Sequence, residues 1–199
     1  MPHTSGSVAA GVNVARIQSA VTELLLAIGE DPSRPGLSRT PERVGQAYAE
    51  FFSGVGVDPL THLLDALEGA PDGELVVMRG IEFRSICEHH LLPFLGVAHI
   101  AYAPSDRIVG LGRLPRVVDT IASRPQLQER LGEEIADALD EGLAPRGVLV
   151  VLDAVHSCVT ARGVRQVESS TVTVASRGVL ADPVQRAEVM ALIGAGGAA

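Results

Sequence analysis

The segment Ser85–His90 places a thiol, a carboxylate and two imidazoles in four consecutive positions, Cys87, Glu88, His89 and His90, between two apolar runs. Thiolates and imidazoles are common zinc ligands, and an imidazole that titrates near neutrality can also move protons. A single Cys-x-x-His pair is weak support for a metal site, because buried cysteines and hydrogen-bonded histidines are frequent in protein cores. A metal site therefore requires further ligands from elsewhere in the chain.

A second cluster, His156-Ser157-Cys158, again pairs an imidazole with a thiol at the end of a predicted strand. The two clusters together offer two thiolates and three imidazoles. A catalytic zinc site uses three protein ligands and keeps one position open, whereas a structural site closes all four positions. A closed Cys2His2 site can be assembled from these residues, so both kinds of site stay open at this point.

The spacing within each cluster helps to sort the roles. At a tight turn or in one turn of helix, residues three apart can point the same way, so Cys87 and His90 can share a metal while His89 points elsewhere. In a strand, the alternation of side chains would bring His156 and Cys158 to the same face. An open zinc site with spare histidines beside it is typical of a hydrolytic centre, where the metal activates water and an imidazole shuttles protons.

The elements that must position these residues follow from hydrophobic periodicity, capping residues and turn signals. The predicted helices are 14–28, 40–52, 60–68, 114–123, 125–142 and 183–193, and the predicted strands are 74–84, 95–103, 147–156 and 168–176. A turn at 70–73 separates the N-terminal helices from the first strand. This order predicts an α+β fold in which the Cys-Glu-His-His segment lies at the turn of an antiparallel strand pair.

Composition and charge limit the classes of function that this protein can have. The chain of 199 residues has a net charge of −8, which argues against binding nucleic acid through bulk electrostatics. All sixteen basic residues are Arg, so an anionic ligand would be met by a local arginine cluster. The start lacks a signal-peptide pattern and no segment approaches the roughly 18 apolar residues of a membrane span. We therefore expect a cytoplasmic protein without a membrane partner, in which the two cysteines form no disulfide.

Several separated motifs, taken together, resemble the GTP cyclohydrolase I family. They are Ile28-Gly29-Glu30-Asp31, Thr40-Pro41-Glu42-Arg43-Val44, Ser85-Ile86-Cys87-Glu88-His89-His90-Leu91-Leu92-Pro93-Phe94, Gly110-Leu111 followed by Arg116, Arg124-Pro125-Gln126-Leu127-Gln128-Glu129-Arg130-Leu131, His156-Ser157-Cys158 and Ala161-Arg162-Gly163. The resemblance covers about 14–193, and the motifs occur in the right order.

The resemblance implies a zinc enzyme that opens the imidazole ring of GTP, releases C8 as formate and recloses the remainder as 7,8-dihydroneopterin triphosphate. On this chain the zinc ligands would be Cys87, His90 and Cys158. His89 and His156 would transfer protons, with His156 donating to N7 of the purine. We interpret Glu88 as a structural residue that orients a histidine.

The resemblance also implies a set of substrate contacts. Glu129 would accept hydrogen bonds from N1 and the amino group of guanine, with Gln128 as its neighbour in base recognition. Arg113, Arg116 and Arg162 would attract the triphosphate. Without the resemblance, Glu129 is an ordinary solvated helix residue and each arginine an ordinary surface charge.

The fold implied is the tunnelling fold, or T-fold, a four-stranded antiparallel sheet with two helices on one face, here preceded by an N-terminal helical extension. We expect a disordered tail at 1–13, a helical region at 14–70, the catalytic T-fold domain at 71–193 and a flexible tail at 194–199. In this family five such sheets join into a barrel and two rings stack. The resemblance therefore implies a homodecamer of two stacked pentamers with active sites between subunits.

The sequence departs from the family pattern mainly where the ribose and the phosphates would bind. Gly112 and Arg113 stand where members commonly have serine and lysine, so a hydroxyl near the ribose is missing while the positive charge remains. Other departures are Val97 after Gly96, Arg84 in place of an aromatic residue, and Gly178-Val179-Leu180 in the last motif. None of them touches the expected metal ligands or the two spare histidines.

Three functions remain to be separated. The first is the complete conversion of GTP, supplying folate-type pterins, other pterins or deazapurines. The second is a paralogue that stops at a ring-opened intermediate because Gly112 lacks the hydroxyl. The third is a non-catalytic, zinc-stabilised ring that binds nucleotides, against which the two spare histidines argue, since a binding module does not need them.

Overall fold

The computed structural model describes residues 11–68 and 74–194, and its contacts divide the chain into two compact units, Met1–Val57 and Asp58–Ala199. The predicted turn at 70–73 lies outside the described residues. The predicted tails lie outside them too, apart from 11–13 and Gly194.

The N-terminal unit is a helix pair, α1 (Val14–Ala27) and α2 (Thr40–Phe51). Asn13 caps α1 by accepting a hydrogen bond of 2.9 Å from the backbone N–H of Arg16. Thr40 is the first helical residue of α2, and no side chain caps this helix. The two helices pack closely at Gly45, where a Cβ would lie 3.0 Å from Gln18 of α1.

The second unit is built on a mixed sheet in the order β5-β2-β3-β6-β7. Its long strands are β2 (Val76–Cys87), β3 (Pro93–Ala103), β6 (Gly147–His156) and β7 (Thr171–Gly178), all paired antiparallel. They confirm the predicted four-stranded antiparallel sheet. The sequence missed β5 (Pro125–Gln126), a two-residue strand that pairs parallel with the end of β2.

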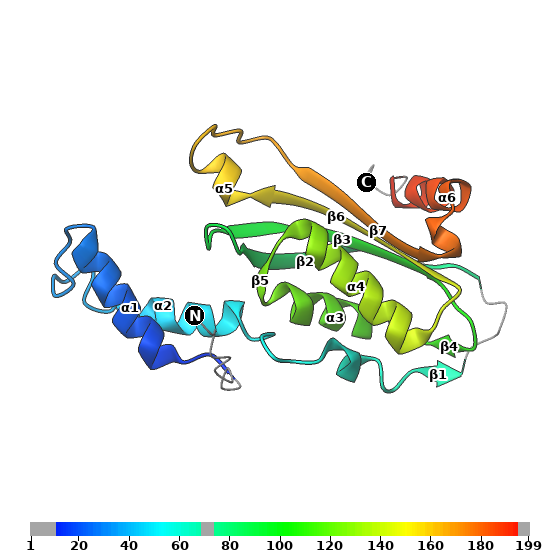
Figure 1. The fold of residues 1–199 in the computed structure, drawn as a ribbon, viewed down its shortest axis with the longest axis horizontal. Coiled ribbons are helices and arrows are strands. Elements are labelled where there is room, and N and C mark those ends of the chain that lie inside the picture. The colour runs from blue at the N-terminus through cyan, green and yellow to red at the C-terminus, as the bar shows by residue number, and fades with distance from the viewer. Residues whose placement is uncertain (1–10, 69–73, 195–199) are drawn as a thin grey trace, which may run out of the picture. The chain divides into compact units, whose positions relative to one another are not determined.

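Helices α3 (Arg113–Ala122) and α4 (Gln128–Leu143) cover one face of this sheet (Figure 1). The remaining elements of the unit are η1 (Pro59–His62), β1 (Leu67–Glu68), β4 (Arg107–Ile108), α5 (Ser157–Thr160), η2 (Val179–Ala181) and α6 (Pro183–Gly194). No helix in the described part of the chain combines the length and apolarity needed to cross a bilayer.

The two faces of the sheet bury different side chains, because alternate residues of a strand point to opposite sides. On β3, Ala98, Ile100 and Tyr102 belong to the main core, which includes the apolar side of α3 and α4. Ala101, between them, joins a smaller core that also contains Val189 of α6. The α+β fold class and the two helices on one face are therefore confirmed.

The predicted helix at 60–68 is wrong. Pro59–His62 forms only a 3-10 turn, which Asp58 caps by accepting 2.9 Å from the backbone N–H of Leu60. The chain then extends, and Leu67–Glu68 pairs with β4. The leucines of this segment suggested a helix with one apolar face. In the structure Leu63 is the one leucine of the segment that is buried, so the segment has no continuous apolar face.

Two glycines of the sheet unit provide a matched test of this packing. At Gly132 in α4 an added Cβ would meet Leu152 at 3.6 Å, an ordinary contact, whereas at Gly96 in β3 it would lie 2.2 Å from the Asp153 carbonyl oxygen. We expect Gly132→Ala to stabilise the fold by about 1 kcal/mol through helix propensity. We expect Gly96→Ala to cost about 3 kcal/mol by forcing β3 from β6.

Thermal unfolding at one fixed protein concentration measures both variants, since assembly would also contribute to the midpoint. A rise for Gly132→Ala and a fall for Gly96→Ala are the predicted results. Equal midpoints for the two variants would contradict the packing described at β3 and β6.

Candidate metal centre

The two sequence clusters meet because β3 lies between the strands that carry them. The end of β2 pairs with the start of β3, Ile86 opposite Pro93, and the next residue of β3, Phe94, lies opposite His156 at the end of β6. Backbone pairing therefore brings the C-terminal ends of β2 and β6 to the same end of the sheet. Segments that lie far apart in the sequence become neighbours there.

A tight turn presents the first cluster. The backbone N–H of Cys87 donates to the Leu92 carbonyl at 2.9 Å, and that of Leu91 donates back to the Cys87 carbonyl at 2.8 Å. Leu91 takes a left-handed conformation with φ of 51°, which closes the turn. The backbone N–H of Glu88 donates to the Gln126 carbonyl of β5 at 3.1 Å, so the missed strand holds the turn in place.

The structure gathers Cys87, His90 and Cys158 into one group whose ligand atoms all lie within 4.8 Å of one another. Among the described residues it is the one group of three or more side chains able to hold a metal. Both cysteines are free thiols. Burial, and then the neighbouring Cys87, raise the pKa of the Cys158 thiol, because both disfavour a thiolate at this position.

The second cluster differs from its sequence prediction in one respect. Strand β6 ends at His156, and Cys158 lies in the short helix α5 rather than on the same strand face. A turn, not strand alternation, therefore points the thiol toward Cys87.

His156 is held from two sides. Its ring stacks on Phe94 with centroids 4.6 Å apart and planes 6° apart, and its Nε2 lies 2.6 Å from Oε1 of Gln128. Burial lowers the pKa of His156, while the charge of Glu129 acts in the opposite direction. Glu129, an exposed residue in the first turn of α4, is thus near enough to act on this imidazole.

His89 is exposed, and its ring stands edge-on to that of His90 at 6.2 Å. It does not belong to the group of three. Two imidazoles close in sequence to the three possible ligands therefore stay outside the group. They are His89, next to His90, and His156, two residues before Cys158.

Glu88 forms an ion pair with Arg130 of α4, a contact that sequence reasoning missed. Arg130 also donates to Oε1 of Gln126 at 3.1 Å and lies 3.5 Å from Glu134. This network joins the Cys-Glu-His-His turn to the first turns of α4. The sequence holds no signal for the pair, because 42 residues separate its members.

The arginines expected at the triphosphate occupy two separate places. Arg113 and Arg116 line a hollow of about 300 Å³ together with Gly110, Leu111 and Gly112 at the start of α3. Arg113 is also paired with Asp65. Arg162 is exposed after α5 and lies close enough to Cys158 for its charge to oppose the rise in the thiol pKa.

Helix α3 separates the first of these places from the metal group. Its C-terminal end lies beside β2, where Ser85 Oγ donates to the Ala122 carbonyl at 2.7 Å. Arg113 is at the opposite end of the helix, about 15 Å away for ten residues at the usual rise. Within one chain, the structure thus does not bring Arg113 to Cys87.

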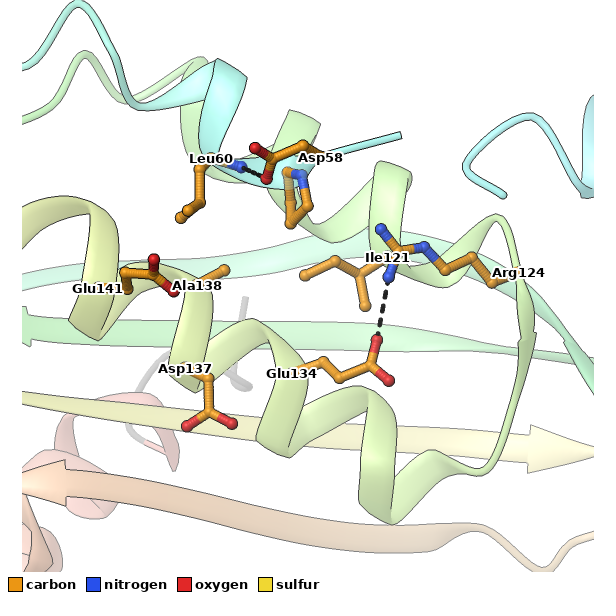
Figure 2. A pocket seen from close by; sticks show the side chains of 9 residues that line it. Asp58, Leu60, Ile121, Arg124, Glu134, Asp137, Ala138 and Glu141 are labelled. Atoms are coloured by element: carbon orange, nitrogen blue, oxygen red, sulfur yellow. Dashed lines mark hydrogen bonds and ion pairs between the residues drawn. The ribbon is translucent and has the colours of Figure 1, made fainter. Parts of the chain in front are cut away.

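A further hollow of about 260 Å³ lies between η1 and helices α3 and α4 (Figure 2). Its acidic side chains are Asp58, Glu134, Asp137 and Glu141, and Arg124 pairs with Glu134 at 3.3 Å. None of the expected metal ligands, proton-transfer residues or substrate contacts lines it.

Two thiols and one imidazole that can hold a metal, with further imidazoles beside them, are the features of a mononuclear metal hydrolase. The profile of the GTP cyclohydrolase I family matches residues 17–194. The chain therefore belongs to the GTP cyclohydrolase I family.

Similar proteins named GTP cyclohydrolase 1 span nearly the whole chain. That of Leifsonia xyli is 59% identical over 94% of this chain and 99% of its own length. Those of Rhodopirellula baltica and Clostridioides difficile are each 52% identical over 92% of this chain, covering 80% and 97% of their own. A crystal structure of the archaeosine synthase QueF-Like in the apo form is 17% identical, aligns over 55% of this chain and 97% of its own, and has a TM-score of 0.45.

The composition of the metal group can be tested by removing one side chain at a time. With Zn²⁺ supplied, we expect Cys158→Ala to lose tightly bound metal, because only two ligands remain, and His89→Ala to retain about one ion per chain. Metal content after gel filtration measures both. Retention by Cys158→Ala, or equal loss by His89→Ala, would contradict the group of three.

Proposed function

We propose that this chain, as a GTP cyclohydrolase I, hydrolyses GTP at C8 with zinc, releases formate and recloses the ring as 7,8-dihydroneopterin triphosphate. The observation that carries the proposal is the convergence of Cys87, His90 and Cys158 at one end of the sheet in a member of this family. The finer steps follow from what each neighbouring side chain can do.

Zinc suits the donor set, because two thiolates and one imidazole are the ligands it prefers, and three protein ligands leave a fourth position for water or substrate. Cys87, His90 and Cys158 would hold the zinc ion, which would supply activated water at neutral pH. We assign no metal contact to His89 or His156. Each of them then keeps a ring nitrogen for proton transfer.

His156 is our candidate for the proton donor to N7 of the purine. Protonation at N7 makes C8 electrophilic, so the proton must be delivered from a fixed point beside the ring. The stack on Phe94 and the contact with Gln128 give His156 such a fixed position. The more exposed His89 would serve the later proton transfers of ring opening.

Substrate recognition is assigned to residues around these histidines. The Glu129 carboxylate can accept from both N1 and the amino group of guanine, and its proximity to His156 supports this role. We assign the triphosphate to Arg113, Arg116 and Arg162. The guanidinium fork suits phosphate oxygens, and Arg113 and Arg116 already line one hollow.

We further propose a homodecamer of two stacked pentamers with active sites between subunits. Within the described residues the outer edge of β7 pairs with no strand, and Val172 and Val174 on it are 56% and 44% exposed. Open edges of this kind favour pairing with another chain. A neighbouring subunit could also supply the Arg113 and Arg116 hollow that lies a helix length from the metal group.

Location and domain limits complete the proposal. We propose a cytoplasmic enzyme whose T-fold domain spans 71–193, preceded by a helical region at 14–70 and flanked by tails at 1–13 and 194–199. The pathway served, whether to folate-type pterins, other pterins or deazapurines, is set by the enzymes that consume the product.

The late sugar rearrangement is the step most affected by the departures of this sequence from the family pattern. Gly112 lies at the N-terminal end of α3 and offers no side-chain cap or hydroxyl, and an added Cβ there would meet nothing within 4 Å. The second candidate function is accordingly an enzyme that stops after ring opening. We favour the complete conversion because Arg113 and Arg116 still provide positive charge beside this position.

Incubation of the zinc-loaded protein with GTP, following formate and fluorescent pterin, tests the proposed function. We expect both products in equal amounts from the wild type. His156→Ala should lower turnover by about 100-fold or more, because general acid catalysis is lost, while zinc content is kept.

The other outcomes separate the alternatives. Formate without pterin would favour the enzyme that stops at a ring-opened intermediate. Absence of both products, with GTP left unconsumed by the zinc-loaded protein, would contradict either enzyme and favour a nucleotide-binding ring. Unchanged turnover in His156→Ala would refute the assignment of His156.

A further inference from the structure

We propose that Gln128 is a positioning residue for His156, which fixes the orientation of the imidazole and places a ring proton on Nε2. Gln128 is the first residue of α4 and is only 2% exposed. Its side chain joins the start of α4 to the ends of β6 and β7. The inference rests on the proposed function for its catalytic meaning, but its geometric part stands on this contact alone.

The amide of Gln128 can face in only one direction. Its Nε2 lies 3.2 Å from the Leu152 carbonyl oxygen and 2.7 Å from that of Thr171, and 3.2 Å from the hydroxyl of Thr173. Carbonyl oxygens only accept hydrogen bonds, so the NH2 group must point toward them. A flipped amide would place Oε1 against two acceptors in a buried site and leave them without a donor.

The direction of the amide then decides the protonation of the neighbouring ring. Oε1 of Gln128 faces Nε2 of His156 at 2.6 Å, and an amide oxygen can only accept. Nε2 must therefore carry a hydrogen. In the neutral imidazole this leaves Nδ1 as the nitrogen with the free lone pair, so the proton that His156 exchanges with substrate is the one at Nδ1.

Phe94 restricts the ring in the remaining direction. Its ring is fully buried and lies parallel to the imidazole, at 6° and 4.6 Å, so it fixes the plane in which His156 can rotate. The hydrogen bond from Gln128 fixes the ring within that plane. Together these contacts determine where Nδ1 points without any contribution from the metal.

The Gln128 side chain then positions His156 and takes no part in base recognition. Both ends of its amide are occupied by protein groups in the buried interior. A direct side-chain bond to guanine would require Gln128 to give up its contact with His156 or with a strand. Base recognition in this part of the site would then be carried by the exposed Glu129.

Steady-state kinetics with GTP on zinc-loaded variants test the catalytic part. In Gln128→Met the acceptor is lost and the volume kept, so we expect kcat to fall about 100-fold through misplacement of the ring, with little change in KM. Thr120→Val is the matched control, because it also removes a partly buried side-chain hydrogen bond while keeping the volume, but the partner lost is His62 rather than His156.

The control should keep kcat near the wild-type value. A rise in KM with kcat unchanged in Gln128→Met would overturn the proposal in favour of base recognition. An equal loss of kcat in Thr120→Val would also overturn it, because it would indicate a general structural effect.

Neutron diffraction from deuterium-exchanged crystals of the wild-type, zinc-loaded protein tests the tautomer without reference to turnover. We expect deuterium on Nε2 of His156, directed at Oε1 of Gln128, and two deuterons on Nε2 of Gln128. A bare Nε2 would overturn the inference even in an active enzyme. If the wild type releases no formate from GTP, the proposed function fails, and the neutron result still decides whether Gln128 orients His156.

Discussion

Strand β3 is hydrogen-bonded to β2 on one side and to β6 on the other, and the candidate site depends on these two registers. Ile86 opposite Pro93 and Phe94 opposite His156 bring the ends of β2 and β6 together. A shift of one residue in either register would turn the side chains of a strand to the opposite face. The close approach of β3 and β6 at Gly96 leaves no room for a Cβ, which helps to fix the second register.

Two ion pairs hold charged residues of the sheet unit, one beside the candidate metal group and the other a helix length away from it. Arg130 pairs with Glu88 and ties the metal-binding turn to α4, while Arg113 pairs with Asp65 beside the hollow at α3. Exposed ion pairs of this kind contribute little stability, so under the proposed function the triphosphate would replace the Asp65 carboxylate at small cost. An anionic substrate can thus be met locally although the chain as a whole is acidic.

The sequence predicted several long elements well, because α3 and α4 each have one apolar face and β6 is a continuous apolar run. The limits of β6 were those predicted, and α3, α4 and α6 agree with their predictions to within three residues. It failed at 60–68 and 125–126, where a short capped turn and a two-residue strand depend on partners distant in sequence. Periodicity carries no information about such partners.

The candidate site likewise has a part that the sequence predicted and a part that it could not predict. Residue types and spacing suggested that Cys87 and His90 share a metal, the family resemblance implied Cys158 as the third ligand, and the structure brings the three ligand atoms together. The contacts of Gln128 with His156 and of Glu88 with Arg130 could not be predicted, because each joins residues on separate elements whose side-chain directions follow only from packing. These contacts, rather than the ligands themselves, determine how the two spare histidines are held.

We propose that Cys87, His90 and Cys158 alone hold the metal and leave one of its positions open. X-ray absorption at the zinc edge of the loaded protein tests it directly. The account predicts two sulfur ligands at about 2.3 Å and two nitrogen or oxygen ligands at about 2.0 Å, of which one is an imidazole. A spectrum that requires two imidazoles would show a closed Cys2His2 site and contradict the account.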